Sequence, residues 1–315
     1  SRNGNFYFYH EGGEQLFCDN ETNNERMYRR ANDVPYVKDG INDFVVNNRP
    51  TVNPDKEGTK AAVWLKAEIA AGKSRTFRVR LSSTVQENPW KDFEEIIARR
   101  IQETNEYYEQ LAAPHNLSKK HQKLLRSAMS ELLWTKQFYY LDIYKWTFGE
   151  QHEKAPHRNY KRNYDWQHLT CRNIISMPDK WEYPWFAAWD LAFHAATFVH
   201  IDPPFAKQQL SLMLREYYMH PNGQIPAYEW NFSDVNPPVH AWSVWYVYEA
   251  DKKKTGVPDW DFLERSFQKL LINFTWWVNQ KDANGIHIFE GGFLGLDNIG
   301  VFDRNHMPQG IKKLQ

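Results

Sequence analysis

The pattern of hydrophobic positions is strand-like over the first part of the chain. Residues 5–9 alternate Phe and Tyr, and residues 61–69 lead through the turn Ala71-Gly72-Lys73-Ser74 into residues 77–81. Two short runs on either side of a glycine-containing turn predict a hairpin. The segment between residues 9 and 61 is rich in Asn, Asp, Gly and Pro and is predicted to form long loops. Residues 1–86 would make a poor sandwich by themselves, so we predict the C-terminal part of a β-sandwich domain.

From residue 88 onward the apolar residues recur at helical spacing. A charged helix over residues 90–111 is predicted to act as a linker, within residues 87–117. Five further helices are predicted: one capped by Ser118 and running to about residue 146, one over 185–200, one opened by Asp202-Pro203 and stopping at 221–223, one opened by Pro237-Pro238, and one capped by Asp259 and ending near 283–285.

The links between these helices alternate in length. Helices two and three, and helices four and five, are joined by a few residues, whereas the links after helices one, three and five are long. Because successive helices run up and down, all the long links meet at one end of the helical layer. This layout is typical of an α/α toroid whose open face carries the function. We therefore predict a mainly α chain in which residues 118–315 are part of a toroid.

Composition excludes some classes of function and favours another. Lys plus Arg and Asp plus Glu both total 39, so the basic surface of a nucleic-acid-binding protein is not predicted. No apolar run approaches 18 residues, so no membrane span is predicted. The two cysteines form neither a disulfide framework nor a metal-ligand pattern. The 14 Trp and 17 Tyr of this polar chain suit a neutral partner with flat apolar faces, such as a carbohydrate.

The first candidate site lies in residues 181–194. If a helix begins near Trp185, then Trp189 lies one turn further on, Asp190 begins the second turn, and His194 follows at i+4. Trp rings can pack on pyranose faces, and an acid beside them could protonate a glycosidic oxygen. Desolvation would raise the pKa of the Asp190 carboxyl, whereas the helix N-terminus would lower it. The alternative is a buried aspartate that ties the helix to a loop, and spacing alone leaves both readings open.

Two further segments carry polar groups suited to sugar hydroxyls. Residues 228–242 supply carboxylates, amides, an imidazole and indoles, namely Glu229, Trp230, Asn231, Asp234, Asn236, His240 and Trp242. Residues 293–304 supply Asp297, Asn298, Asp303 and Arg304. Turn formation, helix capping and a structural salt bridge explain the same residues equally well. No set of side chains has metal-ligand spacing.

Four runs of sequence resemble glycoside hydrolase family 63, which includes processing α-glucosidase I and the hydrolases of mannosylglycerate and glucosylglycerate. They are residues 174–194, 219–230, 234–242 and 295–304. The resemblance covers most of the chain from Ser118 onward and extends weakly to residues 37–43. It is closer to the shorter cytosolic-type members than to the eukaryotic glucosidase I branch, which favours a cytoplasmic location.

The resemblance implies an (α/α)6 catalytic toroid behind a β-sandwich. It also implies inverting hydrolysis of α-glycosidic bonds, without a cofactor, in a small glucoside, mannosylglycerate, glucosylglycerate or an oligosaccharide. Asp190 falls on the general acid of the family. The general base is a Glu further along, beyond residue 315. An inverting enzyme needs two carboxyls about 6.5–9.5 Å apart. The remainder of the polypeptide, or another chain, would therefore have to complete the site.

With this resemblance, the candidate sugar platforms are Trp185, Trp189, Trp230 and Trp242. The candidate hydroxyl ligands are Asn236, His240, Asp297, Asn298 and Asp303. Because the chain begins without Met and stops just after a motif-rich loop, we expect a stretch of a longer polypeptide. The rival hypothesis is a catalytically inactive carbohydrate-binding or scaffold protein, which would bind sugars without cleaving them.

Overall fold

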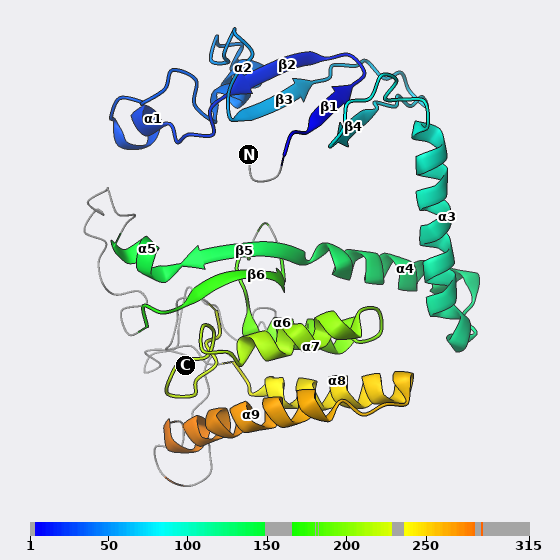
Figure 1. Ribbon diagram of the computed structural model, residues 1–315, viewed down its shortest axis with the longest axis vertical. Coiled ribbons are helices and arrows are strands. Elements are labelled where there is room, and N and C mark those ends of the chain that lie inside the picture. Colours follow the sequence, from blue (N-terminus) through cyan, green and yellow to red (C-terminus); the bar gives the residue numbers. More distant parts are fainter. Residues whose placement is uncertain are drawn as a thin grey trace, which may run out of the picture. The chain divides into compact units, whose positions relative to one another are not determined.

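The computed structural model describes residues 4–148, 166–179, 181, 183–228, 236–280 and 285 (Figure 1). The chain divides into two compact units, Ser1–Asn105 and Glu106–Gln315. Helices make up most of the regular structure, so the prediction of a mainly α chain is confirmed. The predicted domain limits at residues 86 and 117 stay predictions.

The first unit contains two separate pairs of antiparallel strands. Strand β1 (Tyr7–His10) pairs with β4 (Val79–Ser82), and β2 (Glu14–Cys18) pairs with β3 (Lys60–Trp64). The predicted hairpin of residues 61–69 with 77–81 is therefore wrong. A turn does form at Gly72, whose φ of 71° is left-handed. Both strands that flank it pair instead with strands much earlier in the chain, so the local turn signal did not determine the pairing.

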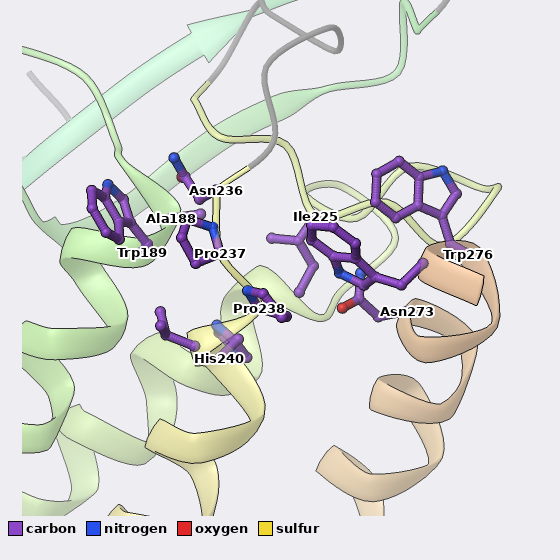
Figure 2. A pocket seen from close by; sticks show the side chains of 11 residues that line it. Ala188, Trp189, Ile225, Asn236, Pro237, Pro238, His240, Asn273 and Trp276 are labelled. Carbon is purple, nitrogen blue, oxygen red and sulfur yellow. The ribbon is translucent and has the colours of Figure 1, made fainter. Parts of the chain in front are cut away.

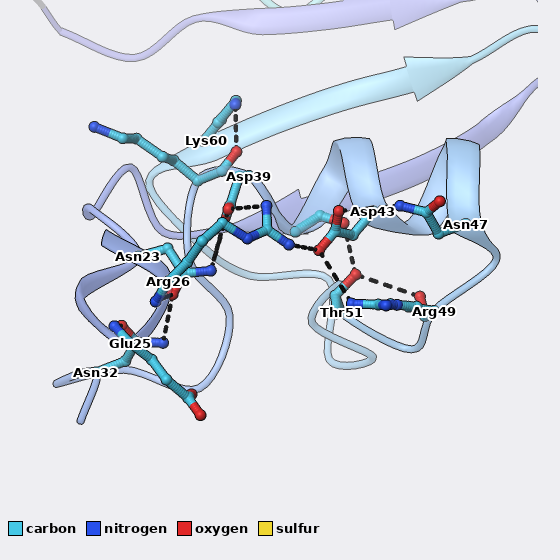
Figure 3. Close-up of polar contacts among 12 residues, drawn as sticks. Asn23, Glu25, Arg26, Asn32, Asp39, Asp43, Asn47, Arg49, Thr51 and Lys60 are labelled. Atoms are coloured by element: carbon cyan, nitrogen blue, oxygen red, sulfur yellow. Dashed lines mark hydrogen bonds and ion pairs between the residues drawn. The ribbon is translucent and has the colours of Figure 1, made fainter. Parts of the chain in front are cut away.

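The segment between β2 and β3 was predicted as loops but contains two helices, α1 (Asn24–Tyr28) and α2 (Gly40–Asn47). The Asn23 side chain caps α1 by accepting from the Arg26 backbone N–H at 3.0 Å. The Arg26 guanidinium binds Asp39 at 2.5 Å and also binds the buried Asp43 (Figure 3). Asn and Asp read as loop residues in the sequence because they also form the caps and ion pairs that hold short helices.

A long helix, α3 (Phe93–Ala112), forms where the charged linking helix was predicted, and the limit between the two units falls within it. After the 3-10 turn η1 (Ala113–His115), helix α4 (Lys119–Trp134) begins at its predicted cap, Ser118. The prediction that this helix runs to residue 146 is wrong. It ends at Trp134 and is followed by strand β5 (Lys136–Asp142) and the short helix α5 (Ile143–Phe148).

Strand β5 pairs antiparallel with β6 (Thr170–Ser176), which the sequence analysis also missed. Tyr139 of β5 is buried, while Phe138 and Tyr140 on either side of it are exposed. This alternation is that of a strand with one covered face. In the sequence it was obscured because both faces carry aromatic residues.

Four helices form the rest of the second unit: α6 (Ala188–Phe198), α7 (Pro203–Met213), α8 (Val239–Thr255) and α9 (Trp260–Gln280). Figure 1 shows α6 and α7 between the β5–β6 pair and helices α8 and α9. Asp202 caps α7 by accepting from Phe205 N–H at 3.1 Å, and Asp259 caps α9 by accepting from Phe262 N–H at 3.0 Å. These two predicted starts are confirmed.

Two predicted helix limits in this unit are corrected. Helix α6 begins at Ala188 and not near Trp185, and α7 ends at Met213, well before residue 221. The core beneath these helices is apolar and closely packed, with Leu191, Phe198 and Leu210 fully buried. No helix among the described residues combines the length and apolar character needed to cross a membrane.

Candidate active site

Backbone contacts with Ala227 and Tyr228 fix the first turn of α6. Ala187 forms an isolated antiparallel bridge with Tyr228, and Ala188 N–H donates to the Ala227 carbonyl at 2.9 Å. All three alanines are buried. These backbone contacts set where α6 begins and therefore where Trp189 and Asp190 lie.

Asp190 lies in the first turn of α6 and is half-buried. Burial raises the pKa of its carboxyl, and the hydrogen bond from its own backbone N–H opposes this shift without cancelling it. Among the described residues, no charged group contributes to the shift. A general acid must carry its proton when it meets the substrate, and a raised carboxyl pKa favours this protonated form.

His194, one turn after Asp190, belongs to a structural network. Its Nδ1 lies 2.7 Å from Ser176 Oγ, which in turn lies 2.7 Å from Thr135 Oγ1. The Ser176 backbone N–H donates to Gln209 Oε1 at 2.9 Å, and Gln209 Nε2 donates back to the Ile174 carbonyl. This network joins α6 and α7 to the end of β6, so His194 helps to hold the helix that carries Asp190.

A pocket opens beside the first turn of α6, as Figure 2 shows. It encloses about 350 Å³ of empty space, part of which is open to solvent. It is lined by Ala188, Trp189, Ile225, Asn236, Pro237, Pro238, Val239, His240, Asn273, Trp276 and Trp277. Asp190 directly follows two of these residues and is not itself in the lining. The pocket thus joins the start of α6, the start of α8 and the end of α9.

His240 lies in the first turn of α8 and is buried. Its Nε2 lies 2.9 Å from the Leu210 carbonyl oxygen. Because a carbonyl only accepts, Nε2 carries the hydrogen, and Nδ1 is left as an acceptor. This Nδ1 is buried, with no hydrogen-bond partner among the described residues. Burial lowers the pKa of His240 to about 4, so the ring is neutral at neutral pH.

Asn236 provides a second acceptor of the same kind. Its Oδ1 is buried and has no hydrogen-bond partner within the described part of the chain. Asn236 leads into Pro237 and Pro238, which line the same wall of the pocket as His240 (Figure 2). The predicted candidates Trp189, Asn236 and His240 are therefore brought together by the fold.

Two pocket residues were missed by the sequence analysis, Trp276 and Trp277 near the end of α9. They are 5% and 7% exposed, and their ring centroids lie 5.3 Å apart in an edge-on arrangement. Asn273, one turn earlier, donates from Nδ2 to the Gly223 carbonyl at 2.7 Å and so fixes this end of α9 beside Ile225. Their signal in the sequence was the pair of adjacent indoles just before the long link after the fifth predicted helix.

Other predicted residues lie away from the pocket or outside the described residues. Trp185 packs against the apolar core, with its ring 5.4 Å from that of Tyr183. Trp242 is 48% exposed, and its ring stacks on that of Tyr246 at 5.5 Å. Neither lines the pocket, and a sugar-binding role for them stays a prediction. The candidates Trp230, Asp297, Asn298 and Asp303 lie outside the described residues.

Comparison with known proteins supports a carbohydrate-cleaving domain. Residues 183–304 match the family model of the mannosylglycerate hydrolase MGH1-like glycoside hydrolase domain. The matched stretch includes Asp190 and every residue that lines the pocket. This part of the chain is thus similar to a glycoside hydrolase domain.

A longer relative is known from Saccharomyces cerevisiae, the uncharacterized protein YMR196W. The two sequences are 46% identical over 312 residues, which is 94% of this chain and 29% of the relative. The chain therefore spans less than a third of the length of this relative.

No group of three or more His, Cys, Asp or Glu side chains suited to a metal ion is found among the described residues.

Proposed function

We propose that this chain carries the acid-bearing part of an inverting α-glycosidase of the family 63 type. Its substrate is a small glucoside, mannosylglycerate, glucosylglycerate or an oligosaccharide. The observation that carries the proposal is the half-buried Asp190, whose carboxyl pKa is raised by burial, beside Trp189 of the pocket. This arrangement lies inside the stretch that matches a glycoside hydrolase domain.

In the proposed reaction, Asp190 protonates the glycosidic oxygen as the bond to the anomeric carbon breaks. Water then attacks that carbon from the opposite face, activated by a second carboxylate about 6.5–9.5 Å from the first. The resemblance to family 63 assigns this base to a Glu beyond residue 315. The rest of the polypeptide, or another chain, supplies the base.

We further propose that residues 118–315 are the first part of an (α/α)6 toroid and that residues 1–86 are the end of a β-sandwich. Helix α8 supports the toroid because it buries Val244, Val247 and Tyr248 on one face and also carries aromatic side chains on its exposed face, which is typical of a helix covered on both faces. Its residues Trp242 and Trp245 are 48% and 54% exposed in this chain. Further helices of a toroid would cover them.

We also propose a cytoplasmic location, because the sequence resembles the cytosolic-type members of family 63 more than the glucosidase I branch.

The test uses the full-length protein with Asp190→Asn. Asparagine has the same shape but cannot donate the acid proton, so kcat should fall by roughly 10²–10⁴-fold. Release of glucose or mannose from small α-glycosides measures this. The matched control is Asp261→Asn, an exposed aspartate on α9 paired with Arg265, which should leave turnover unchanged. Near-normal turnover of the Asp190 variant would rule out Asp190 as the acid.

The second candidate function is a carbohydrate-binding protein that does not cleave. The pocket lined by indoles, with buried acceptors, favours it as much as it favours an enzyme. If this candidate is correct, the full-length wild type should bind sugar and release no monosaccharide. Asp190→Asn should then change neither property.

A further inference from the structure

Helix α6 carries a histidine one turn after Asp190, and a chain of hydroxyl groups determines which of its ring nitrogens holds the hydrogen. We infer that His194 is a positioning residue for Asp190: its fixed tautomer offers a bare acceptor, Nε2, on the face of α6 that carries the acid, and so favours the protonated carboxyl. The inference rests on the proposed function, which it deepens by naming what keeps the acid ready to donate.

The first step is the direction of the hydrogen bonds behind His194. Thr135 Oγ1 donates its single hydrogen to the Leu132 carbonyl at 2.7 Å, because a carbonyl only accepts. Thr135 Oγ1 therefore accepts from Ser176 Oγ, which lies 2.7 Å away. This bond uses the single hydrogen of Ser176, so Ser176 Oγ accepts from His194 Nδ1, also at 2.7 Å. The hydrogen of the imidazole is thus on Nδ1.

The second step is the consequence for the other ring nitrogen. A neutral imidazole carries one hydrogen, so Nε2 of His194 is an acceptor. Burial lowers the pKa of His194, which favours the neutral ring. Within the described part of the chain, no hydrogen bond to Nε2 is found. His194 is half-buried, and its Nε2, unlike the Nδ1 of His240, is not enclosed.

The third step is the position of this acceptor relative to the acid. Residues four apart on a helix share a face, with Cβ atoms about 5–6 Å apart. Helical side chains lean towards the N-terminus, so His194 leans towards the turn that carries Asp190. A direct hydrogen bond or one bridging water spans such a separation. Neither residue belongs to the buried face of α6, which is formed by Ala188, Leu191, Ala192, Ala195, Ala196 and Phe198.

The fourth step is the chemistry of a carboxyl beside a bare acceptor. A protonated carboxyl can donate a hydrogen bond, whereas a carboxylate can only accept one. An acceptor therefore stabilises the protonated form of Asp190 and offers nothing to the carboxylate. The other tautomer of His194, with its hydrogen on Nε2, would do the opposite. His194 takes up no proton in the reaction, and the proton of Asp190 goes to the glycosidic oxygen.

No charged side chain replaces His194 in this role among the described residues. The elements packed against α6 are β6, α7 and α8. Their titratable side chains are Cys171 and Arg172 of β6, Lys207 of α7, and His240, Tyr246, Tyr248, Glu249, Asp251, Lys252, Lys253 and Lys254 of α8. None of them contributes to the pKa shifts of Asp190 and His194, which burial causes. The tautomer of His194 is thus the polar influence that the fold fixes near the acid.

The experiment compares the full-length wild type with two variants. His194→Asn keeps an N–H donor for Ser176 in the place of Nδ1 and has no Nε2. Ser176→Ala removes the acceptor of Nδ1–H, so that the ring can adopt either tautomer. The control is His121→Asn, at an exposed position in α4. The pH profile of kcat/KM for small α-glycosides is one readout, because its alkaline limb reports the ionisation of the acid. The other is an infrared titration of the protonated carboxyl band that Asp190→Asn lacks.

The expected result is a shift of both the alkaline limb and the infrared midpoint to lower pH. The shift should be about one pH unit in His194→Asn, since one hydrogen bond to the protonated form is lost. Ser176→Ala should shift both in the same direction, and His121→Asn should match the wild type. If His194→Asn fails to fold, Ser176→Ala decides. A purely structural role of His194 would instead lower kcat/KM at every pH without moving the limb.

Two results would overturn the inference: wild-type midpoints in the folded variants, or a shift to higher pH. The infrared titration does not depend on catalysis, so the two proposals fail separately. If Asp190→Asn keeps normal turnover while the infrared midpoint falls in the variants, the catalytic proposal fails and the role of His194 stands. If Asp190→Asn loses turnover while the midpoints of the variants are unchanged, the acid stands and the role of His194 fails.

Discussion

The His240 ring is buried, and its contribution to the stability of the fold therefore depends on pH. Burial lowers its pKa from the ordinary 6.5 to about 4, so the folded protein binds fewer protons than the unfolded chain between these values. Stability is therefore lost as the pH falls from 6.5 towards 4. The loss from this one residue is about 3 kcal/mol in the free energy of unfolding.

His240→Gln should abolish this part of the pH dependence, since Gln does not titrate. Urea unfolding of wild type and variant at several pH values between 4 and 7 measures the difference. His121→Gln, at an exposed position in α4, is the control and should keep the wild-type slope. An identical slope in the His240 variant would show that this ring is not held neutral by burial.

Asp190 has the opposite dependence on pH. Burial raises its carboxyl pKa, so the folded protein keeps this proton to higher pH than the unfolded chain does. The contribution of Asp190 to stability is therefore present at low pH and lost as the pH rises through the folded pKa. Asp190→Asn removes the ionisation. The variant should therefore gain more in Tm at pH 7 than at pH 4, as a calorimetric scan would measure. A larger gain at pH 4 would contradict a desolvated carboxyl.

The sequence identified the chemistry of several site residues without their surroundings. Asn236 and His240 stood out because amides and imidazoles suit sugar hydroxyls. The sequence could not show which of their atoms lack a partner among the described residues. For His240 this depends on the Leu210 carbonyl, 30 residues earlier. The same limit applies to Trp276 and Trp277, which the sequence analysis did not single out and which the fold places in the lining of the same pocket as Asn236.

At the scale of the elements, one lysine connects three helices. Lys207 of α7 binds Asp251 of α8 and Asp259, the cap of α9, both at 2.6 Å. The side chains of Lys207 and Asp251 are 17% and 10% exposed. Because these charges are largely withdrawn from water, removal of the lysine would leave an unpaired buried carboxylate.

Lys207→Met should therefore lower the free energy of unfolding by about 3 kcal/mol in urea denaturation. The double variant Lys207→Met with Asp251→Leu should recover part of this loss, since the buried Asp251 carboxylate is then no longer left unpaired. Lys252→Met, in an exposed pair with Glu249, is the control and should cost about 0.5 kcal/mol or less. A loss as small as that of the control would mean that the three helices do not depend on this ion pair.

Helix starts were predicted better than strands, and the reason is the range of the interactions. Asp202 and Asp259 cap α7 and α9 through N–H groups three residues further on, so the whole signal is local in the sequence. Strand β5 exists because it pairs with β6, which begins 34 residues after β5 begins. Nothing within residues 136–142 reveals that partner. The hairpin predicted around Gly72 failed for the same reason.

At the scale of the whole molecule, the described residues hold the proposed acid, Asp190, and a pocket, whereas the proposed inverting hydrolysis needs two carboxylates. The yeast relative is more than three times as long as the region it shares with this chain, so a longer protein could carry the second carboxylate elsewhere. The proposed division of the site between different parts of a polypeptide is open to a direct test.

We expect the full-length protein to release sugar from small α-glycosides, and residues 1–315 by themselves to do so roughly 10²–10⁴-fold more slowly, because the general base is missing. Both proteins are assayed at equal concentration, and the full-length Asp190→Asn variant gives the background rate. Titration with D-glucose and D-mannose shows whether the shorter chain still forms the pocket of Trp189, Asn236 and His240. A shorter chain with full activity would mean that the base lies within residues 1–315, with Asp297 and Asp303 as the first candidates.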